Sequence, residues 1–380
     1  MKHSDDGTSC RVLLSGVDAL CLALDVVWQD DGLFTRLRFA KDAAQNNKGT
    51  PEPFVLVNDE KEPLFFEVRP HGMRGYEWLL VSHAFSLRFA NAKRPGNRPN
   101  VYVEIRSESL WHLGPIEAMT RVLDALKRNN AVLHNVKISR LDLCADVLMP
   151  EEMFGPELLD LAVCRARDAA MYFRRGQATF LTGIHIGRGA MSARLYDKPR
   201  EISDRGHKKD WMYSLWNLSE VPEGFKVIRV EFQLRREPLK ELGLDSVWSA
   251  FTEFEHIWAY CTEKWLKFQD RPGLHHTQRS TLPWWQDVQS NIMGLCGGVP
   301  LVREKAIKAD ERQLTSQALG LLTSLAVLAE NNAGMDAGQN VFAAIREVFE
   351  ANLMQNASRQ KLADSVQLKR AKYRRGGSHE

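Results

Sequence analysis

Three segments of the chain alternate apolar and polar side chains with a period of two, the pattern of a β-strand with one buried face. They read RLDLCAD from Arg140, RLYDK from Arg194 and RVEFQLR from Arg229. In each segment the charged or reactive side chains fall on one face and the apolar ones on the other. If the three strands lie in one sheet, carboxylates, a tyrosine and several cations converge on a single surface.

The same patterning predicts the remaining elements. We expect a turn and a buried strand over 15–28, a hairpin over 179–198, and helices from Gly114-Pro115 to about 128, from Pro150 to about 169, and over 246–269. Further strands are predicted at 65–68, 76–82, 85–89, 101–105, 136–147 and 225–234. Strand, helix, strand, helix, hairpin and strand in this order indicate an α+β fold with a largely antiparallel sheet and flanking helices.

The chain is expected to divide into a disordered N-terminus (1–14), a main domain (15–270), a linker (271–300) and a helical module with a basic tail (301–380). The segments 17–26 and 140–147 are weakly similar. This similarity suggests two pseudo-repeated halves, 15–130 and 131–270.

Composition narrows the classes of function. The net charge of the 380 residues is only +3, so binding to nucleic acid would depend on local basic surfaces. The six cysteines form no C-x-x-C pair, which argues against a zinc site and a disulfide framework. No apolar run is long enough to span a membrane, and we expect a cytoplasmic protein.

The polar faces contain the groups needed for attack on a phosphodiester. Carboxylates from adjacent strands can bind Mg²⁺ or Mn²⁺, and Tyr196 is the candidate nucleophile. Arg194 and Lys198 could favour the phenolate and bind the developing phosphorane. Other roles stay open: Asp142 could pair with Arg140, and Asp146 could pair with Arg140 or cap the helix predicted after it. Asp18 could be a turn residue or a ligand, and His185 a packing residue or a ligand.

These segments resemble motifs of the rolling-circle replication initiation factors of plasmids and filamentous phages, the Rep_trans group, whose relatives include relaxases of conjugative elements. The resemblance covers about 15–265. It rests on the opening strand around Asp18, the strand from Arg140 to Asp146, the passage from Gly187-Arg188 to Lys198, and the strand from Arg229.

The resemblance implies a fold like that of the HUH endonucleases and a site-specific DNA nickase. Tyr196 would join to the 5′ phosphate and leave a free 3′-OH primer, with Arg194 and Lys198 assisting. Asp142, Glu231 and Asp146 would be the metal ligands. The chain has no His-hydrophobic-His pair, so carboxylates would replace the usual histidine ligands.

The implied partners are origin DNA, single-stranded or as a hairpin, a host helicase and polymerase in a bacterial cytoplasm, and a second copy of the chain. The predicted DNA contacts are Arg140, Arg188, Arg229, Arg235, Arg174 and Arg175. Two alternatives are a relaxase that nicks a transfer origin and a non-catalytic regulator that binds an origin.

Overall fold

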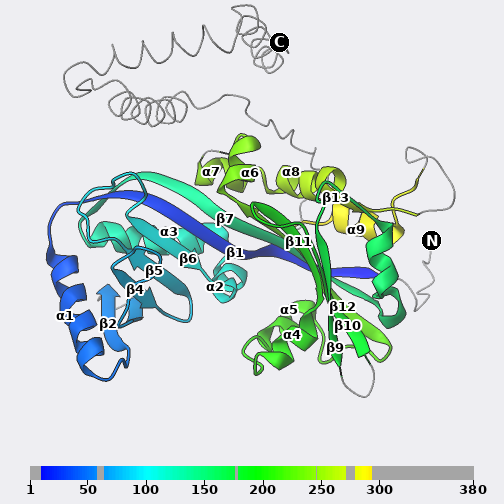
Figure 1. Cartoon of the computed structure of the whole chain (residues 1–380), viewed down its shortest axis with the longest axis horizontal. Coiled ribbons are helices and arrows are strands. Elements are labelled where there is room, and N and C mark those ends of the chain that lie inside the picture. The colour runs from blue at the N-terminus through cyan, green and yellow to red at the C-terminus, as the bar shows by residue number, and fades with distance from the viewer. Residues whose placement is uncertain (1–9, 58–63, 176–178, 245, 271–278, 293–380) are drawn as a thin grey trace, which may run out of the picture. The chain divides into compact units, whose positions relative to one another are not determined.

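One antiparallel sheet dominates the described part of the chain (Figure 1). The computed structural model describes residues 10–57, 64–175, 179–244, 246–270 and 279–292. Eleven of its strands pair in the order β2-β3-β4-β5-β6-β1-β7-β12-β11-β10-β9. Their bounds are β1 (Arg11–Trp28), β2 (Glu52–Val57), β3 (Leu64–Val68), β4 (Trp78–Val81), β5 (Phe85–Phe89), β6 (Val101–Ile105), β7 (Ala131–Pro150), β9 (Ala169–Arg175), β10 (Thr179–Ile186), β11 (Met191–Asp197) and β12 (Phe225–Arg235). A separate pair joins β8 (Ala162–Cys164) to β13 (Leu266–Phe268).

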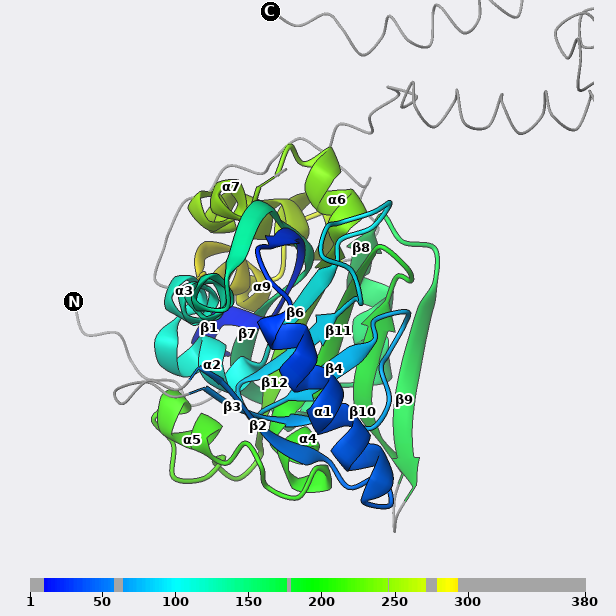
Figure 2. The same cartoon turned by 90° about the vertical axis from the view of Figure 1, so that its left-hand side faces the viewer.

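Helices flank this sheet, which confirms the predicted α+β class (Figure 2). They are α1 (Gly32–Asn46), α2 (Ser107–Leu113), α3 (Pro115–Arg128), α4 (Lys198–Asp204), α5 (Trp211–Trp216), α6 (Arg236–Glu241), α7 (Val247–Thr252), α8 (Phe254–Ala259) and α9 (Pro283–Ser290). Two 3₁₀ turns, η1 (Glu151–Met153) and η2 (Pro156–Leu161), and a π-helical turn, η3 (Tyr260–Trp265), complete the described elements.

The sheet has the same strand order on either side of its centre. In the first half β1 pairs with β6, and the order then runs back through β5, β4 and β3 to β2. In the second half β7 pairs with β12, and the order runs back through β11 and β10 to β9. The long strands β1 and β7 pair with each other in the middle. Two pseudo-repeated halves would produce this arrangement.

The apolar positions of the three patterned strands form the core on one side of the sheet. Leu141, Leu143 and Ala145 are completely buried, as the period of two predicts. Phe232 packs edge-on against Trp258 and other rings of the helical layer. Trp284 and Trp285 of α9 also lie in this core, so their rings are not available to stack on nucleic-acid bases. The other face of the same strands carries the polar side chains.

Several element predictions were wrong. The strand β1 begins at Arg11, inside the segment expected to be disordered, and the polar stretch after Trp28 contains α1. The helix expected from Pro150 to about 169 is replaced by η1, η2 and β8, because Gly155-Pro156 interrupts it. The single helix expected over 246–269 is divided into α7, α8, η3 and β13, and β9 was not foreseen.

The chain separates into two compact units, 1–303 and 304–380. The predicted helical module and its basic tail lie outside the described residues. Among the residues that are described, no helix is long and apolar enough to cross a membrane.

Candidate active site

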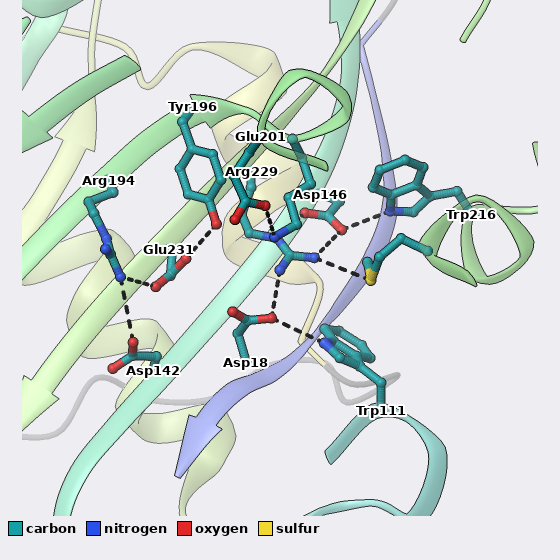
Figure 3. Close-up of polar contacts among 12 residues, drawn as sticks. Asp18, Trp111, Asp142, Asp146, Arg194, Tyr196, Glu201, Trp216, Arg229 and Glu231 are labelled. Carbon is teal, nitrogen blue, oxygen red and sulfur yellow. Dashed lines mark hydrogen bonds and ion pairs between the residues drawn. The ribbon is translucent and has the colours of Figure 1, made fainter. Parts of the chain in front are cut away.

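The three patterned strands are neighbours, and their registers align the predicted side chains. Arg194 of β11 lies opposite Glu231 of β12, and Tyr196 lies opposite Arg229. On the other side of β12, Glu231 lies opposite Cys144 of β7. Asp142 is two residues before Cys144, so its side chain is the neighbour of Cys144 on the same face. The polar surface expected from sequence is therefore present, and Figure 3 shows its side chains converging.

Tyr196 and Glu231 form the central contact of this surface. The Tyr196 hydroxyl donates a hydrogen bond to Glu231 Oε2 at 2.8 Å. Burial raises the pKa of Tyr196 well above its ordinary value, and the charge of Glu231 raises it further. The phenol is therefore protonated at neutral pH, with a carboxylate already in place to accept its proton.

Asp142 and Glu231 form a buried carboxylate pair held by two arginines. Asp142 receives a bidentate hydrogen bond from Arg140, with Nε to Oδ1 at 2.8 Å. Arg194 contacts both acids: it donates to Glu231 and lies 3.6 Å from Asp142 Oδ2. Burial raises the pKa of Asp142 to about 7 against the opposing effect of Arg140, and the neighbouring Glu231 adds to the rise.

Lys198 lies beside Tyr196, but it is not on the strand as predicted. The strand ends at Asp197, whose side chain caps α4 by accepting from the Arg200 backbone N–H, and Lys198 is the first helical residue. The Lys198 ammonium is 5.5 Å from the centre of the Tyr196 ring and donates to Glu201 Oε2 at 2.7 Å. Its side chain is buried, and burial and the charge of Arg229 lower its pKa.

Asp146 and Arg229 form a buried ion pair under the groove. Arg229 is completely buried and donates to both oxygens of Asp146, from Nε at 2.6 Å and from Nη2 at 2.7 Å. The Trp216 indole donates to Asp146 as well, at 2.8 Å. The prediction of a metal ligand at Asp146 and of a DNA contact at Arg229 does not fit this geometry, because both side chains are enclosed and already hydrogen-bonded within this buried network.

Asp18 joins the same network from β1. The register of β1 and β7 shifts between Val17 and Ala19, so Asp18 lies in a β-bulge. Its carboxylate accepts from Arg229 Nη1 at 2.7 Å and from the Trp111 indole at 3.3 Å. Burial alone would raise the pKa of Asp18, but the positive charge of Arg229 outweighs it and the pKa is lowered. From the sequence alone, Asp18 could have been either a turn residue or a metal ligand.

An open groove of about 870 Å³ runs over the polar surface. Its lining includes eight residues singled out from sequence: Asp18, Arg140, Asp142, His185, Arg194, Tyr196, Lys198 and Glu231. It also includes Lys208 and Lys209, a basic pair of the kind that contacts phosphates, and two cations that sequence gave no reason to place there, Arg106 and Arg205. Arg106 and Glu104 come from the first half of the sheet, so the groove spans both halves. Seven Lys or Arg side chains and six Asp or Glu side chains line it, so cations that could contact phosphates stand beside the carboxylates.

Four of the predicted DNA contacts lie away from this groove. Arg188 is in the turn between β10 and β11, and Arg235 is the last residue of β12. Arg174 and Arg175 end the edge strand β9, where Arg174 forms an ion pair with Asp204 of α4. Of the six arginines proposed to bind phosphates, Arg140 alone is a groove-lining residue in the described structure.

The carboxylates of this surface decide how a divalent cation could be held. Within the described ranges, no group of three or more His, Cys, Asp or Glu residues is arranged to hold a metal ion. Mg²⁺, however, commonly takes only one or two carboxylates and fills its other positions with water and substrate phosphate. Asp142 and Glu231 fit that pattern, and the Arg194 guanidinium now supplies the cation between them.

His185 is a further groove residue, on β10 opposite Arg194. Its Nε2 is buried and has no hydrogen-bond partner among the described residues. Burial lowers its pKa, and Arg194 and Arg188 lower it further, so the ring is neutral. In the sequence, its position in the predicted hairpin was the one indication that His185 could lie near the site.

Comparisons with known proteins identify no family for the chain. No protein-family model matches it, and no curated protein matches its sequence. Among solved structures, the chain is similar to a rolling circle replication initiator protein from Geobacillus stearothermophilus, at 14% identity and a TM-score of 0.44. That similarity covers 78% of this chain and 100% of the other. At these values it carries no argument about activity.

Proposed function

We propose that this protein is a site-specific DNA nicking and closing enzyme that initiates rolling-circle replication. One observation carries the proposal: the Tyr196 hydroxyl is hydrogen-bonded to the buried carboxylate of Glu231 in a groove whose lining includes seven Lys or Arg side chains beside six carboxylates. A tyrosine with a base in contact and space for a polyanion above it is the arrangement that nucleophilic attack on a phosphodiester requires. The sequence motifs that resemble rolling-circle initiators include both residues.

In the proposed reaction Tyr196 Oη attacks the scissile phosphorus and passes its proton to Glu231. The new Oη–P bond forms as the P–O3′ bond breaks, and the leaving O3′ takes up a proton from water in the open groove. The products are a 5′-phosphotyrosine link and a free 3′-OH. Attack of a 3′-OH on that link reverses the step and closes the strand, with Glu231 returning the proton to Tyr196.

The cations around Tyr196 have distinct tasks in this proposal. Arg194 is 39% exposed, so it can leave the carboxylate pair and bind the phosphate oxygens. Lys198 lies against the Tyr196 ring and favours the charge that develops on the phenol oxygen. Mg²⁺ or Mn²⁺, held by Asp142 and Glu231, would neutralise charge on the non-bridging phosphate oxygens.

Covalent trapping tests the proposal without knowledge of the origin sequence. A pool of random-sequence single-stranded oligonucleotides, labelled at the 3′ end, is incubated with the protein and Mn²⁺ and resolved on a denaturing gel. We expect label to migrate with wild-type protein but not with Tyr196→Phe, and EDTA to prevent it. A pool labelled at the 5′ end should transfer no label, because the tyrosine retains the 3′ fragment.

Tyr213→Phe is the matched control, because Tyr213 lies on α5 and does not line the groove. It should form the adduct like wild type, and sequencing the trapped DNA should reveal a common cleavage site. An adduct that persists in Tyr196→Phe would overturn the assignment of the nucleophile. Binding to DNA without any adduct would instead favour the non-catalytic regulator.

A further inference from the structure

A row of three residues crosses the outer strands beside Tyr196. Tyr172 of the edge strand β9 lies opposite Gly183 of β10, and Gly183 lies opposite Tyr196 of β11. Residues opposite each other in antiparallel strands point to the same face. Both tyrosines therefore lie on the groove side, two strands or about 10 Å apart. Figure 2 shows β9 at the outer edge of the sheet.

The glycine keeps the space between the two tyrosines open. A Cβ atom at Gly183 would lie 3.3 Å from Tyr196 Cβ and 3.3 Å from the Leu195 carbonyl oxygen, which is tighter than ordinary contact. Any side chain here would press on Tyr196 and fill the gap. A register shift between Leu181 and Gly183 bends β10 at the same point, and Thr182 donates to the Tyr172 carbonyl at 3.0 Å.

A smaller cavity of about 260 Å³, which shares part of its lining with the groove, occupies this place. The three residues of the row line it, and Arg200 and Arg205 of the α4 region form its wall together with their ion-pair partners Asp204 and Glu201. Tyr172 is 55% exposed, although a large exposed ring on an edge strand favours unwanted association with other chains. The cavity thus offers an exposed aromatic face on one side, the nucleophile on the other and guanidinium groups close by.

We infer that this cavity is a nucleotide slot in which a base flanking the scissile phosphate stacks on Tyr172. The inference rests on the proposed function, because a base reaches the slot only if the groove takes DNA. Stacking on an aromatic ring tolerates any base and is a common way to hold single-stranded nucleic acid. Bound there, the base places its phosphate next to Tyr196, and Arg205, which pairs with Glu201 but is 71% exposed, can turn to contact the backbone.

Equilibrium binding of a 3′-fluorescein oligothymidylate, followed by anisotropy in EDTA, tests the slot without cleavage. We expect Tyr172→Ala to weaken binding about tenfold, which is about 1.4 kcal/mol, and Tyr172→Phe to bind like wild type. Phe173→Ala is the matched control. Phe173 is the next residue of β9 and is 48% exposed, but it points to the opposite face, so its removal should leave binding unchanged.

A second measurement locates the base directly. An oligonucleotide with 5-iododeoxyuridine in place of thymidine should cross-link to Tyr172 in the wild-type protein under ultraviolet light. Unchanged binding in Tyr172→Ala, or equal losses in Tyr172→Ala and Tyr172→Phe, would overturn the stacking role. If covalent adducts still form in those variants at the wild-type rate, the slot alone is refuted. Absence of adducts in wild type would refute the proposed function itself.

Discussion

Glu231 contacts two groups of different charge, a neutral phenol and a guanidinium cation. One of its carboxylate oxygens accepts a hydrogen bond from the Tyr196 hydroxyl, and the other accepts one from the Arg194 guanidinium. A carboxylate in this position serves as a base for the phenol while its charge is balanced by Arg194. Asp142, one strand away, would repel Glu231 without that arginine. Arg194 therefore reduces the repulsion between the two carboxylates, and a divalent cation bound in its place would do the same.

Removal of Arg194 tests this view of the carboxylate pair. Without this guanidinium Glu231 loses its arginine partner and faces Asp142, which keeps only Arg140, so Arg194→Gln should lower the melting temperature of the metal-free protein. Mn²⁺ should then raise the melting temperature of the variant by more than that of wild type, as measured by thermal unfolding with and without MnCl₂. Arg174→Gln, which removes an exposed ion pair, should behave like wild type in both conditions. A variant that gains nothing from Mn²⁺ would contradict the cation site.

Asp18 gives a pH-dependent test at the same scale. Its pKa is lower in the folded protein than in the unfolded chain, where it is about 3.9, so its ionised form stabilises the fold above that pH. The stabilisation is lost as the pH falls through the lowered value. Asp18→Asn should therefore reduce the free energy of unfolding at pH 7, and the difference from wild type should shrink by pH 3. Urea unfolding at both pH values would show it, and an undiminished difference would disprove it.

The network of Asp146, Arg229 and Asp18 joins three strands and two helices. It links β7, β12 and β1 to Trp216 of α5 and Trp111 of α2. The floor of the groove is thus fixed by buried charges as well as by apolar packing. Sequence placed Asp146 and Arg229 on the correct face, but it could not tell which polar side chains helices would cover.

Asp146→Asn separates a structural role from a metal-binding role. Loss of the charge leaves the buried Arg229 with Asp18 as its one acidic partner among the described residues, which should cost about 3–5 kcal/mol in the free energy of unfolding. Glu152→Gln, on the exposed turn η1, should cost little. Urea denaturation gives both values. If Asp146→Asn unfolds like wild type and instead loses affinity for Mn²⁺, Asp146 is a metal ligand after all.

The elements that sequence predicted well are those with a strong period and one buried face. The strands β7, β11 and β12 have such a pattern, and α3 has both Pro115 at its start and helical spacing. The missed strand β9 exposes residues on both faces at the sheet edge, so no alternation marks it. The contacts of Asp18 and His185 depend on a bulge and on cross-strand register, which appear only when the strands are paired.

At the scale of the whole molecule, the two halves of the sheet carry related but unequal polar sites. Glu104 of β6 lies opposite Cys21 of β1, as Glu231 lies opposite Cys144. Arg229, two positions before Glu231, lies opposite Tyr196. Tyr102, two positions before Glu104, lies opposite Arg88. Arg88 stacks over Tyr102 at 4.7 Å and pairs with Glu104 at 3.2 Å. An arginine therefore stands where the second half has Tyr196, the proposed nucleophile.

This inequality predicts that one glutamate is needed for the chemistry and the other is not. Glu231→Gln should slow adduct formation by at least about 100-fold, the usual effect of removing a general base. Glu104→Gln, at the equivalent position of the other half, should form the adduct at close to the wild-type rate. Single-turnover trapping with 3′-labelled DNA would measure both. Equal losses in the two variants would show that both halves take part in the reaction.

Mapping the covalent link is the most direct test of the central claim. Wild-type protein trapped on single-stranded DNA with Mn²⁺ is treated with nuclease and trypsin, and the nucleotide-bearing peptide is sequenced by mass spectrometry. We predict the peptide 195–200, LYDKPR, with the 5′ phosphate on Tyr196, its one tyrosine. A nucleotide on any other tyrosine, or an active protein with no nucleotide-bearing peptide, would contradict the account.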